Sequence, residues 1–160
     1  FDRMLDLGCG TGLAGEVFES FCGQIDGIDL SARMVEQARR KAVYRSLSVG
    51  DLRSFLAGRA DQSADLVVAA DVFIYCADLA PIMGDIGRVL PRGGLSAFTV
   101  ETHDGDGVIL GEALRYAHGE PAVRAALAEG GLTPLIFEPA AIRQDAGRPV
   151  PGWAVVAGKA

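Results

Sequence analysis

Three glycines, separated from one another by single residues, follow a short apolar segment near the start of the chain. The segment Met4–Leu7 predicts a strand, and Gly8, Gly10 and Gly12 come directly after it. Residues 14–21 favour a helix. A strand that passes through glycines into a helix exposes bare backbone, and the helix presents its unpaired N–H groups to a ligand. We therefore predict that this turn binds a nucleoside cofactor.

The spacing of the glycines and one nearby acid distinguish between two such cofactors. A dinucleotide-binding turn reads G-x-G-x-x-G, but the third glycine of that pattern is replaced here by Leu13. Asp6 precedes the first glycine, where a carboxylate would repel a pyrophosphate but attract a positive group. S-Adenosylmethionine carries a sulfonium and an amino-acid head group, and it has no phosphate. The pattern therefore favours S-adenosylmethionine over a nicotinamide dinucleotide.

Apolar strand segments alternate with helical segments along most of the chain. This alternation predicts a single domain over residues 1–160, an open α/β sheet with helices on both faces. The last two strands are joined by a polar loop with no room for a helix, so they should be antiparallel neighbours. Residues 102–119 show no regular pattern. The expected strands are 4–7, 24–29, 47–49, 64–71, 95–101, 133–138 and 153–157; the expected helices are 14–21, 32–41 (capped by Ser31), 81–90 and 121–129, with a helix or turn near 52–56.

Acidic residues follow four of the expected strands. They are Asp29, Asp51, Asp71 and Glu101. Because ligands of open α/β sheets bind at the carboxyl ends of the strands, these acids and the glycine turn should share one rim. Asp29 is placed to accept both ribose hydroxyls, and Asp51 could accept from the adenine amino group while the Leu52 N–H donates to the ring. Each acid could instead be a helix cap, a turn residue or a solvated surface group.

Composition and charge narrow the function classes. The chain has 160 residues and a net charge of -6. Its one basic run, residues 39–41, falls at an expected helix end, so we expect no nucleic-acid partner. No apolar run is long enough to span a bilayer, which favours a cytoplasmic protein without a membrane partner. Three cysteines without zinc or disulfide spacing predict reduced thiols and no metal site.

The ordered set of motifs resembles the class I S-adenosylmethionine-dependent methyltransferases. The motifs are Leu-Asp-Leu-Gly-Cys-Gly-Thr-Gly, Gly-Ile-Asp-Leu-Ser, Gly-Asp-Leu, Asp-Leu-Val-Val-Ala-Ala-Asp-Val and Leu-Pro-Arg-Gly-Gly-Leu. This resemblance implies a Rossmann-like seven-stranded sheet in the order 3-2-1-4-5-7-6, with strand 7 antiparallel. Shorter segments look like the methyltransferase domain of bacterial proteins that carry tetratricopeptide repeats. Because the chain starts inside the first strand, we expect that an N-terminal cap over the pocket is missing.

The resemblance also implies a role for each matching position. The methionine part of the cofactor would face Asp6 and the backbone of the glycine turn, and Asp29 would bind the ribose. Leu30 would lie against the adenine, and Asp51 and Leu52 would hold its edge. The complete predicted cofactor set is Asp6, Gly8, Cys9, Gly10, Gly12, Asp29, Leu30, Asp51, Leu52, Asp71 and Val72.

Methyl transfer is an in-line displacement at the sulfonium carbon, so the protein mainly positions and desolvates the reactants. A hydroxyl acceptor also needs a base near its proton. The candidate catalytic residues are His118, Tyr116, Glu101 and His103. The acidic surface favours a small-molecule acceptor, and the oligomeric state is left open. The alternatives are a methyltransferase for proteins, a non-catalytic cofactor-binding module, and a nicotinamide oxidoreductase, against which the glycine spacing and Asp6 argue.

Overall fold

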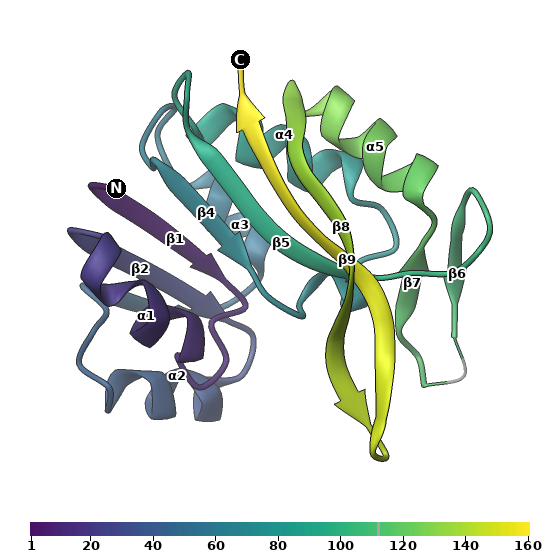
Figure 1. The fold of residues 1–160 in the computed structure, drawn as a ribbon. Coiled ribbons are helices and arrows are strands. Elements are labelled where there is room, and N and C mark those ends of the chain that lie inside the picture. The colour runs from purple at the N-terminus through teal and green to yellow at the C-terminus, as the bar shows by residue number, and fades with distance from the viewer. Residues whose placement is uncertain (112) are drawn as a thin grey trace.

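The computed structural model describes residues 1–111 and 113–160 and contains a seven-stranded and a two-stranded sheet (Figure 1). The strands are β1 (Arg3–Leu7), β2 (Gln24–Asp29), β3 (Ser46–Val49), β4 (Leu66–Ala69), β5 (Leu95–Glu101), β6 (Val108–Leu110), β7 (Tyr116–His118), β8 (Leu132–Asp145) and β9 (Arg148–Lys159). The helices are α1 (Leu13–Phe18), α2 (Ala32–Arg39), α3 (Leu52–Ala57), α4 (Ala80–Val89) and α5 (Glu120–Glu129), with 3₁₀ turns η1 (Glu19–Phe21) and η2 (Phe73–Tyr75).

The large sheet has the order β3-β2-β1-β4-β5-β9-β8. Strands β1 to β5 pair in parallel, and β9 is antiparallel to both β5 and β8. Since β8 and β9 are the sixth and seventh strands of this sheet, the predicted order 3-2-1-4-5-7-6 with an antiparallel last strand is confirmed. Both chain ends lie at the edge opposite the carboxyl ends of the parallel strands (Figure 1).

Alternate residues of the central strands face two different cores. Leu5 of β1 belongs to the larger core, which packs β4, β5 and β9 against α3, α4 and α5. Its neighbour Met4 belongs to the smaller core on the other face, where Ala14 and Phe18 of α1 pack against it. This alternation follows from the two-residue period of a strand. The helices on both faces therefore leave the carboxyl edge of the sheet open for a ligand.

The two residues that predicted helix starts, Ser31 and Pro81, lie at the starts of helices in the structure. The Ser31 hydroxyl accepts the Met34 N–H at 3.3 Å, which satisfies one of the free donors at the start of α2. Pro81 lies in the first turn of α4, where its missing N–H costs nothing. The first helix is shorter than predicted, because the chain tightens into η1 after Phe18. The fourth strand is also shorter, and Asp71 beyond it has a left-handed φ of 54°.

The polar loop predicted between the last two strands is wrong, because these residues continue the hairpin. Strands β8 and β9 run for 14 and 12 residues, and they stay paired as far as Asp145 and Arg148. Ala146 and Gly147 close the hairpin with φ of 48° and 76°. Two successive left-handed residues form the turn whose twist matches paired strands. The tip of this hairpin extends beyond the carboxyl edge of the sheet (Figure 1).

The segment without a regular pattern contains a second, short hairpin. Strand β6 pairs with β7 in antiparallel fashion, and Val108 lies opposite His118. All three residues of β6 are exposed, while Ala117 and His118 of β7 are buried. A strand of three residues is too short for its burial pattern to be predicted from the sequence.

Candidate functional site

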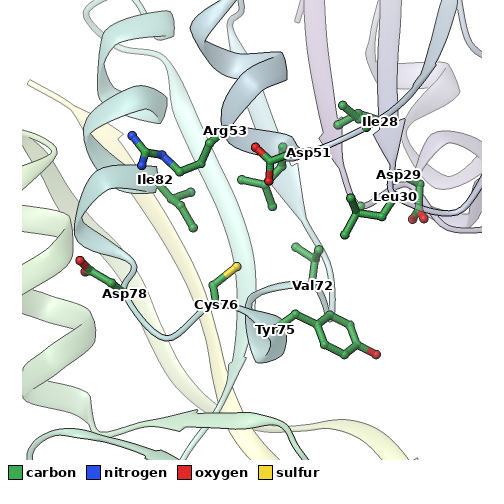
Figure 2. Close-up of a pocket in the computed structure, with 13 residues that line it drawn as sticks. Ile28, Asp29, Leu30, Asp51, Arg53, Val72, Tyr75, Cys76, Asp78 and Ile82 are labelled. Atoms are coloured by element: carbon green, nitrogen blue, oxygen red, sulfur yellow. The ribbon is translucent and has the colours of Figure 1, made fainter.

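A cavity of about 350 Å³ opens at the carboxyl edge of the sheet beside the glycine turn. Ile28 and Leu30 of the β2 end form one wall, and Cys76 and Ile82 form part of the opposite wall (Figure 2). Six predicted cofactor residues line the cavity, namely Gly8, Asp29, Leu30, Asp51, Leu52 and Val72. The structure thus brings together residues from the ends of four strands, β1 to β4, in one cavity.

The glycine turn has a shape that side chains would not allow. Gly8, Gly10 and Gly12 have φ of 68°, 53° and 87°, in the region where residues with a Cβ are strained. At Gly8 the space is closed as well, because an added Cβ would come within 2.4 Å of the Val72 Cγ2 atom. The loop after β1 and the segment after β4 therefore touch at the floor of the cavity.

The Asp29 carboxylate is held in place by two backbone donors. Its Oδ2 atom accepts the Gly10 N–H at 2.9 Å, and its Oδ1 atom accepts the Ser31 N–H at 2.8 Å. A carboxylate has about four acceptor positions, so both oxygens can still accept further hydrogen bonds. This arrangement suits a vicinal diol such as that of a ribose.

Asp51 combines a local role with a place in the cavity lining. Its Oδ1 atom accepts the Ser54 N–H at 2.9 Å and thereby caps α3. The cap leaves the second carboxylate oxygen available to the cavity. The exposed side chain of Leu30, with 74% of its surface accessible, lies on the wall across from it (Figure 2). An acceptor beside an exposed apolar surface fits the edge and face of a purine.

Asp6 lies beneath the glycine turn and is almost completely buried. The Tyr44 hydroxyl donates to its Oδ2 atom at 2.6 Å and accepts the Gly15 N–H at 3.2 Å. The pKa of Asp6 is raised to about 6, chiefly by burial; the Tyr44 hydrogen bond opposes the rise, and the charge of Asp29 adds to it. Tyr44 was missed in the sequence, because nothing in its local pattern points to Asp6. The hydroxyl links the acid to the start of α1.

Cys9 is the predicted cofactor residue whose chemistry the structure restricts most. Its side chain is buried, and burial together with the charges of Asp6 and Asp29 raises the pKa of its thiol to about 12. A thiol with so high a pKa stays protonated near neutral pH and is a poor nucleophile. Cys9 therefore serves packing beneath the turn.

Arg143 on the long hairpin pairs with two of the rim acids. Its Nη1 atom donates to the Asp71 Oδ1 atom at 2.9 Å, and its Nη2 atom donates to the Glu101 carboxylate. Only 14% of the Arg143 side-chain surface is exposed. Burial tends to lower the pKa of this guanidinium, but the two carboxylates outweigh it and raise the pKa. This ion pair could not be predicted from the sequence, because Arg143 was expected in the loop between the last two strands.

The candidate catalytic residues His103, His118 and Tyr116 do not line the cavity. His103 lies in a surface loop, where its Nδ1 atom accepts the Gly105 N–H and its Nε2 atom is 2.9 Å from the Gly107 carbonyl oxygen. His118 is buried, and neither ring nitrogen makes a hydrogen bond with good geometry to the described residues. Burial lowers its pKa, although the nearby backbone of residues 76 and 77 offsets part of this effect. Tyr116 is half-buried at the start of β7.

The fold and the cavity together define a class, the Rossmann-like domains that bind a nucleoside at a glycine turn. The glycine spacing and the antiparallel seventh strand place the chain among those of the methyltransferase type. The family model described as "Methyltransferase domain" matches residues 5–98, more than half of the chain, and the chain belongs to this family.

Curated relatives and solved structures agree with this assignment. The chain is 35% identical over 95 residues to a ubiquinone biosynthesis O-methyltransferase from Bradyrhizobium, covering 58% of the chain and 37% of that protein. It is 27% identical over 126 residues to a malonyl-[acyl-carrier protein] O-methyltransferase from Serratia marcescens, covering 79% and 48%. A SAM-dependent methyltransferase structure from Methanosarcina mazei superposes with a TM-score of 0.78 at 18% identity, covering 99% of the chain and 92% of that structure.

The comparisons confirm the predicted family and cofactor and leave the other predictions of the sequence open. The class I S-adenosylmethionine-dependent methyltransferase family, with S-adenosylmethionine as its cofactor, is confirmed. The chain spans less than half of the length of the two curated relatives, so its acceptor is a matter for proposal. The likeness to repeat-associated proteins and the missing cap remain predictions. Among the described residues, no helix combines the length and apolar character needed to cross a membrane.

Proposed function

We propose that this chain transfers the methyl group of S-adenosylmethionine to a small-molecule acceptor at the carboxyl edge of the sheet. The observation that carries the proposal is the Asp29 carboxylate, which two backbone N–H groups fix at the cavity wall with acceptor capacity to spare. The names of the relatives support an acceptor outside the nucleic acids, and the net charge of -6 agrees with this.

Each part of the cavity has a separate task in holding the cofactor. Asp29 would accept the ribose hydroxyls, and Asp51 would accept from the adenine amino group while Leu30 covers the ring. The left-handed backbone at Gly8 would let the methionine part approach β1 without meeting a Cβ. Asp71 and Val72 would lie at the end where the methyl group is presented. When bound, the cofactor supplies an electrophilic methyl group with a neutral thioether as its leaving group.

The protein contributes mainly positioning and exclusion of water. The apolar walls formed by Ile28, Val72 and Ile82 reduce access of water to the reacting end, which strengthens the electrostatic interactions inside. Holding donor and acceptor in line removes much of the entropic barrier of a bimolecular displacement. None of the four candidate catalytic residues lines the cavity, so the arrangement suits an acceptor that is already nucleophilic, such as a carboxylate.

Binding of the cofactor is tested by thermal unfolding with S-adenosylhomocysteine and, separately, with NADH. A ligand at about 100 times its dissociation constant should add roughly 2.7 kcal/mol to the free energy of unfolding. We expect S-adenosylhomocysteine to raise the melting temperature of the protein and NADH to leave it unchanged. Stabilisation by NADH alone would contradict the proposal.

Turnover is tested with S-adenosylmethionine that carries a tritiated methyl group. The acceptors are a panel of small carboxylic acids, phenols and amines, together with a protein mixture as the competing class. We expect label in the small carboxylic acids. Label found only in protein would contradict the small-molecule acceptor and favour a methyltransferase for proteins. Cofactor binding without any methyl transfer would favour a non-catalytic cofactor-binding module.

A further inference from the structure

The β8–β9 hairpin carries Arg143 across to the rim acids of two other strands. Asp71 follows β4, Glu101 ends β5, and the guanidinium lies between them. The residues of the first pair are 72 positions apart in the chain. A guanidinium presents a planar fork of donors, so it can bridge two carboxylates in a way that an ammonium cannot. The hairpin therefore ties together the ends of two neighbouring strands, β4 and β5.

The Asp71 end of this bridge is held from several sides. Asp71 has a φ of 54°, and its N–H donates to the Thr99 Oγ1 atom at 2.9 Å. The next residue is Val72, whose side chain fills the space against Gly8. A left-handed backbone at a residue other than glycine persists only where the surroundings fix it. The ion pair to Arg143 is one of the contacts that fix it.

The bridge also sets the charge next to Val72, which lines the cavity. One guanidinium faces two carboxylates, so the three groups together carry a single net negative charge. Without the guanidinium, Asp71 and Glu101 would be two like charges at neighbouring strand ends. Their repulsion would favour movement of the exposed one, Asp71, of whose side-chain surface 38% is accessible.

We propose that Arg143 is a positioning residue for the methionine end of the cofactor site, because its ion pairs with Asp71 and Glu101 hold the turn that presses Val72 against Gly8. This inference rests on the proposed function for the identity of the ligand. It does not make Arg143 a catalytic residue, since its contacts are to Asp71 and Glu101 and it does not line the cavity.

The test compares two ligands that differ only at the methionine end. S-Adenosylhomocysteine carries the amino-acid part, and 5′-methylthioadenosine has the same nucleoside with a methyl group in its place. We expect Arg143→Met to weaken S-adenosylhomocysteine at least tenfold by calorimetry and 5′-methylthioadenosine less than threefold. Arg143→Lys, which keeps the charge and loses the fork, should fall between. An equal loss for both ligands, or no loss, would overturn the inference.

The matched control is Arg115→Met. The Arg115 guanidinium pairs with Asp145 farther out on the same hairpin, at 2.9 Å, so its loss removes a hairpin ion pair without touching the rim. We expect this variant to bind both ligands as the unaltered chain does. A change like that of Arg143→Met would show that any hairpin ion pair has this effect, and would overturn the inference.

A second measurement separates this inference from the proposed function. Hydrogen exchange of the ligand-free protein should quicken in residues 70–76 of Arg143→Met and stay unchanged there in Arg115→Met. If the unaltered chain bound neither nucleoside, the proposed function would fail, while the exchange result would still decide whether Arg143 holds this turn. Unchanged exchange in residues 70–76 of Arg143→Met would overturn the inference whatever the binding result.

Discussion

The Asp29 carboxylate accepts the Gly10 N–H at 2.9 Å, and this bond joins the end of β2 to the glycine turn after β1. One side chain therefore shapes the turn and also faces the cavity. A substitution at this position should affect both properties, and a change that keeps the shape should separate them.

Asp29→Asn should weaken S-adenosylhomocysteine by about 1.5–3 kcal/mol, which is more than tenfold, because the charged acceptor for the ribose hydroxyls is lost. The amide oxygen can still accept one backbone N–H, but the amide nitrogen cannot accept the other, so the melting temperature without ligand should fall as well. Calorimetric titration measures the affinity. Glu36→Gln, an exposed acid on α2, is the control and should bind normally. Equal affinity in Asp29→Asn would remove Asp29 from the site.

Gly8→Ala should destabilise the fold more than Gly10→Ala. Both positions have a left-handed φ, so each variant incurs a backbone cost of about 1 kcal/mol. At Gly8 the new Cβ also meets the Val72 Cγ2 atom at 2.4 Å, whereas at Gly10 its nearest neighbour is 4.0 Å away. Overpacking of this kind typically costs about 1–3 kcal/mol more. Urea unfolding compares the two, and equal losses would show that the space at Gly8 is not closed.

Asp6→Asn should change the pH dependence of stability in a defined direction. The folded pKa of Asp6 is raised by burial to about 6, so its favourable contribution is complete below pH 4 and is lost as the pH rises through 6. An amide cannot ionise and keeps an acceptor for the Tyr44 hydroxyl. The variant should therefore gain about 2–3 kcal/mol relative to the unaltered protein between pH 4 and pH 7. Urea unfolding at several pH values measures this difference; a constant difference would contradict the burial effect.

His118→Leu should stabilise the protein at low pH. Burial lowers the folded pKa of His118, so the unfolded chain takes up the proton more readily, and stability falls as the pH drops through about 6.5. The apolar variant removes this loss and also removes a buried ring whose nitrogens have no hydrogen-bond partner among the described residues. We expect a gain of about 1 kcal/mol or more at pH 5.5 and a smaller one at pH 7.5. A larger gain at pH 7.5 would contradict the shift.

Ala146→Asn should stabilise the tip of the long hairpin. Ala146 and Gly147 have φ of 48° and 76°, and Asn-Gly is the pair that best tolerates this turn. The expected gain is about 0.5–1 kcal/mol, measured by thermal unfolding. Ala141→Asn on the exposed part of β8 is the control for a general effect of asparagine and should give no gain.

Most of the sheet could be predicted because its signals are local. Most parallel strands are short apolar segments followed by a glycine or an acid, and helices α2 to α5 each begin at a capping side chain or a proline. The predicted cofactor residues that line the cavity, such as Asp29 and Asp51, lie at strand ends, so topology alone places them on one rim. Their positions at this rim could therefore be predicted without knowledge of any side-chain contact.

The parts that escaped prediction depend on pairing over long distances. The outer halves of β8 and β9 contain Pro139, Pro149 and Pro151, whose low strand propensity indicated a loop. Pairing across the hairpin nevertheless keeps these residues in strands. Arg143 meets Asp71 only because the hairpin is long, and Tyr44 meets Asp6 only because the segment between α2 and β3 packs against β2 and α1. No short window of sequence contains either pair.

The two outer strands of the sheet also limit how molecules of this protein meet one another. The free edge of an outer strand offers unpaired N–H and carbonyl groups, and a second chain can add its own strand there. On one side this strand is β3, with only four residues. On the other it is β8, where Pro134 and Pro139 each lack an N–H and the pairing shifts at residues 134–136. Both margins are therefore poor templates for a further strand, which protects a concentrated solution of the domain against sheet-to-sheet aggregation.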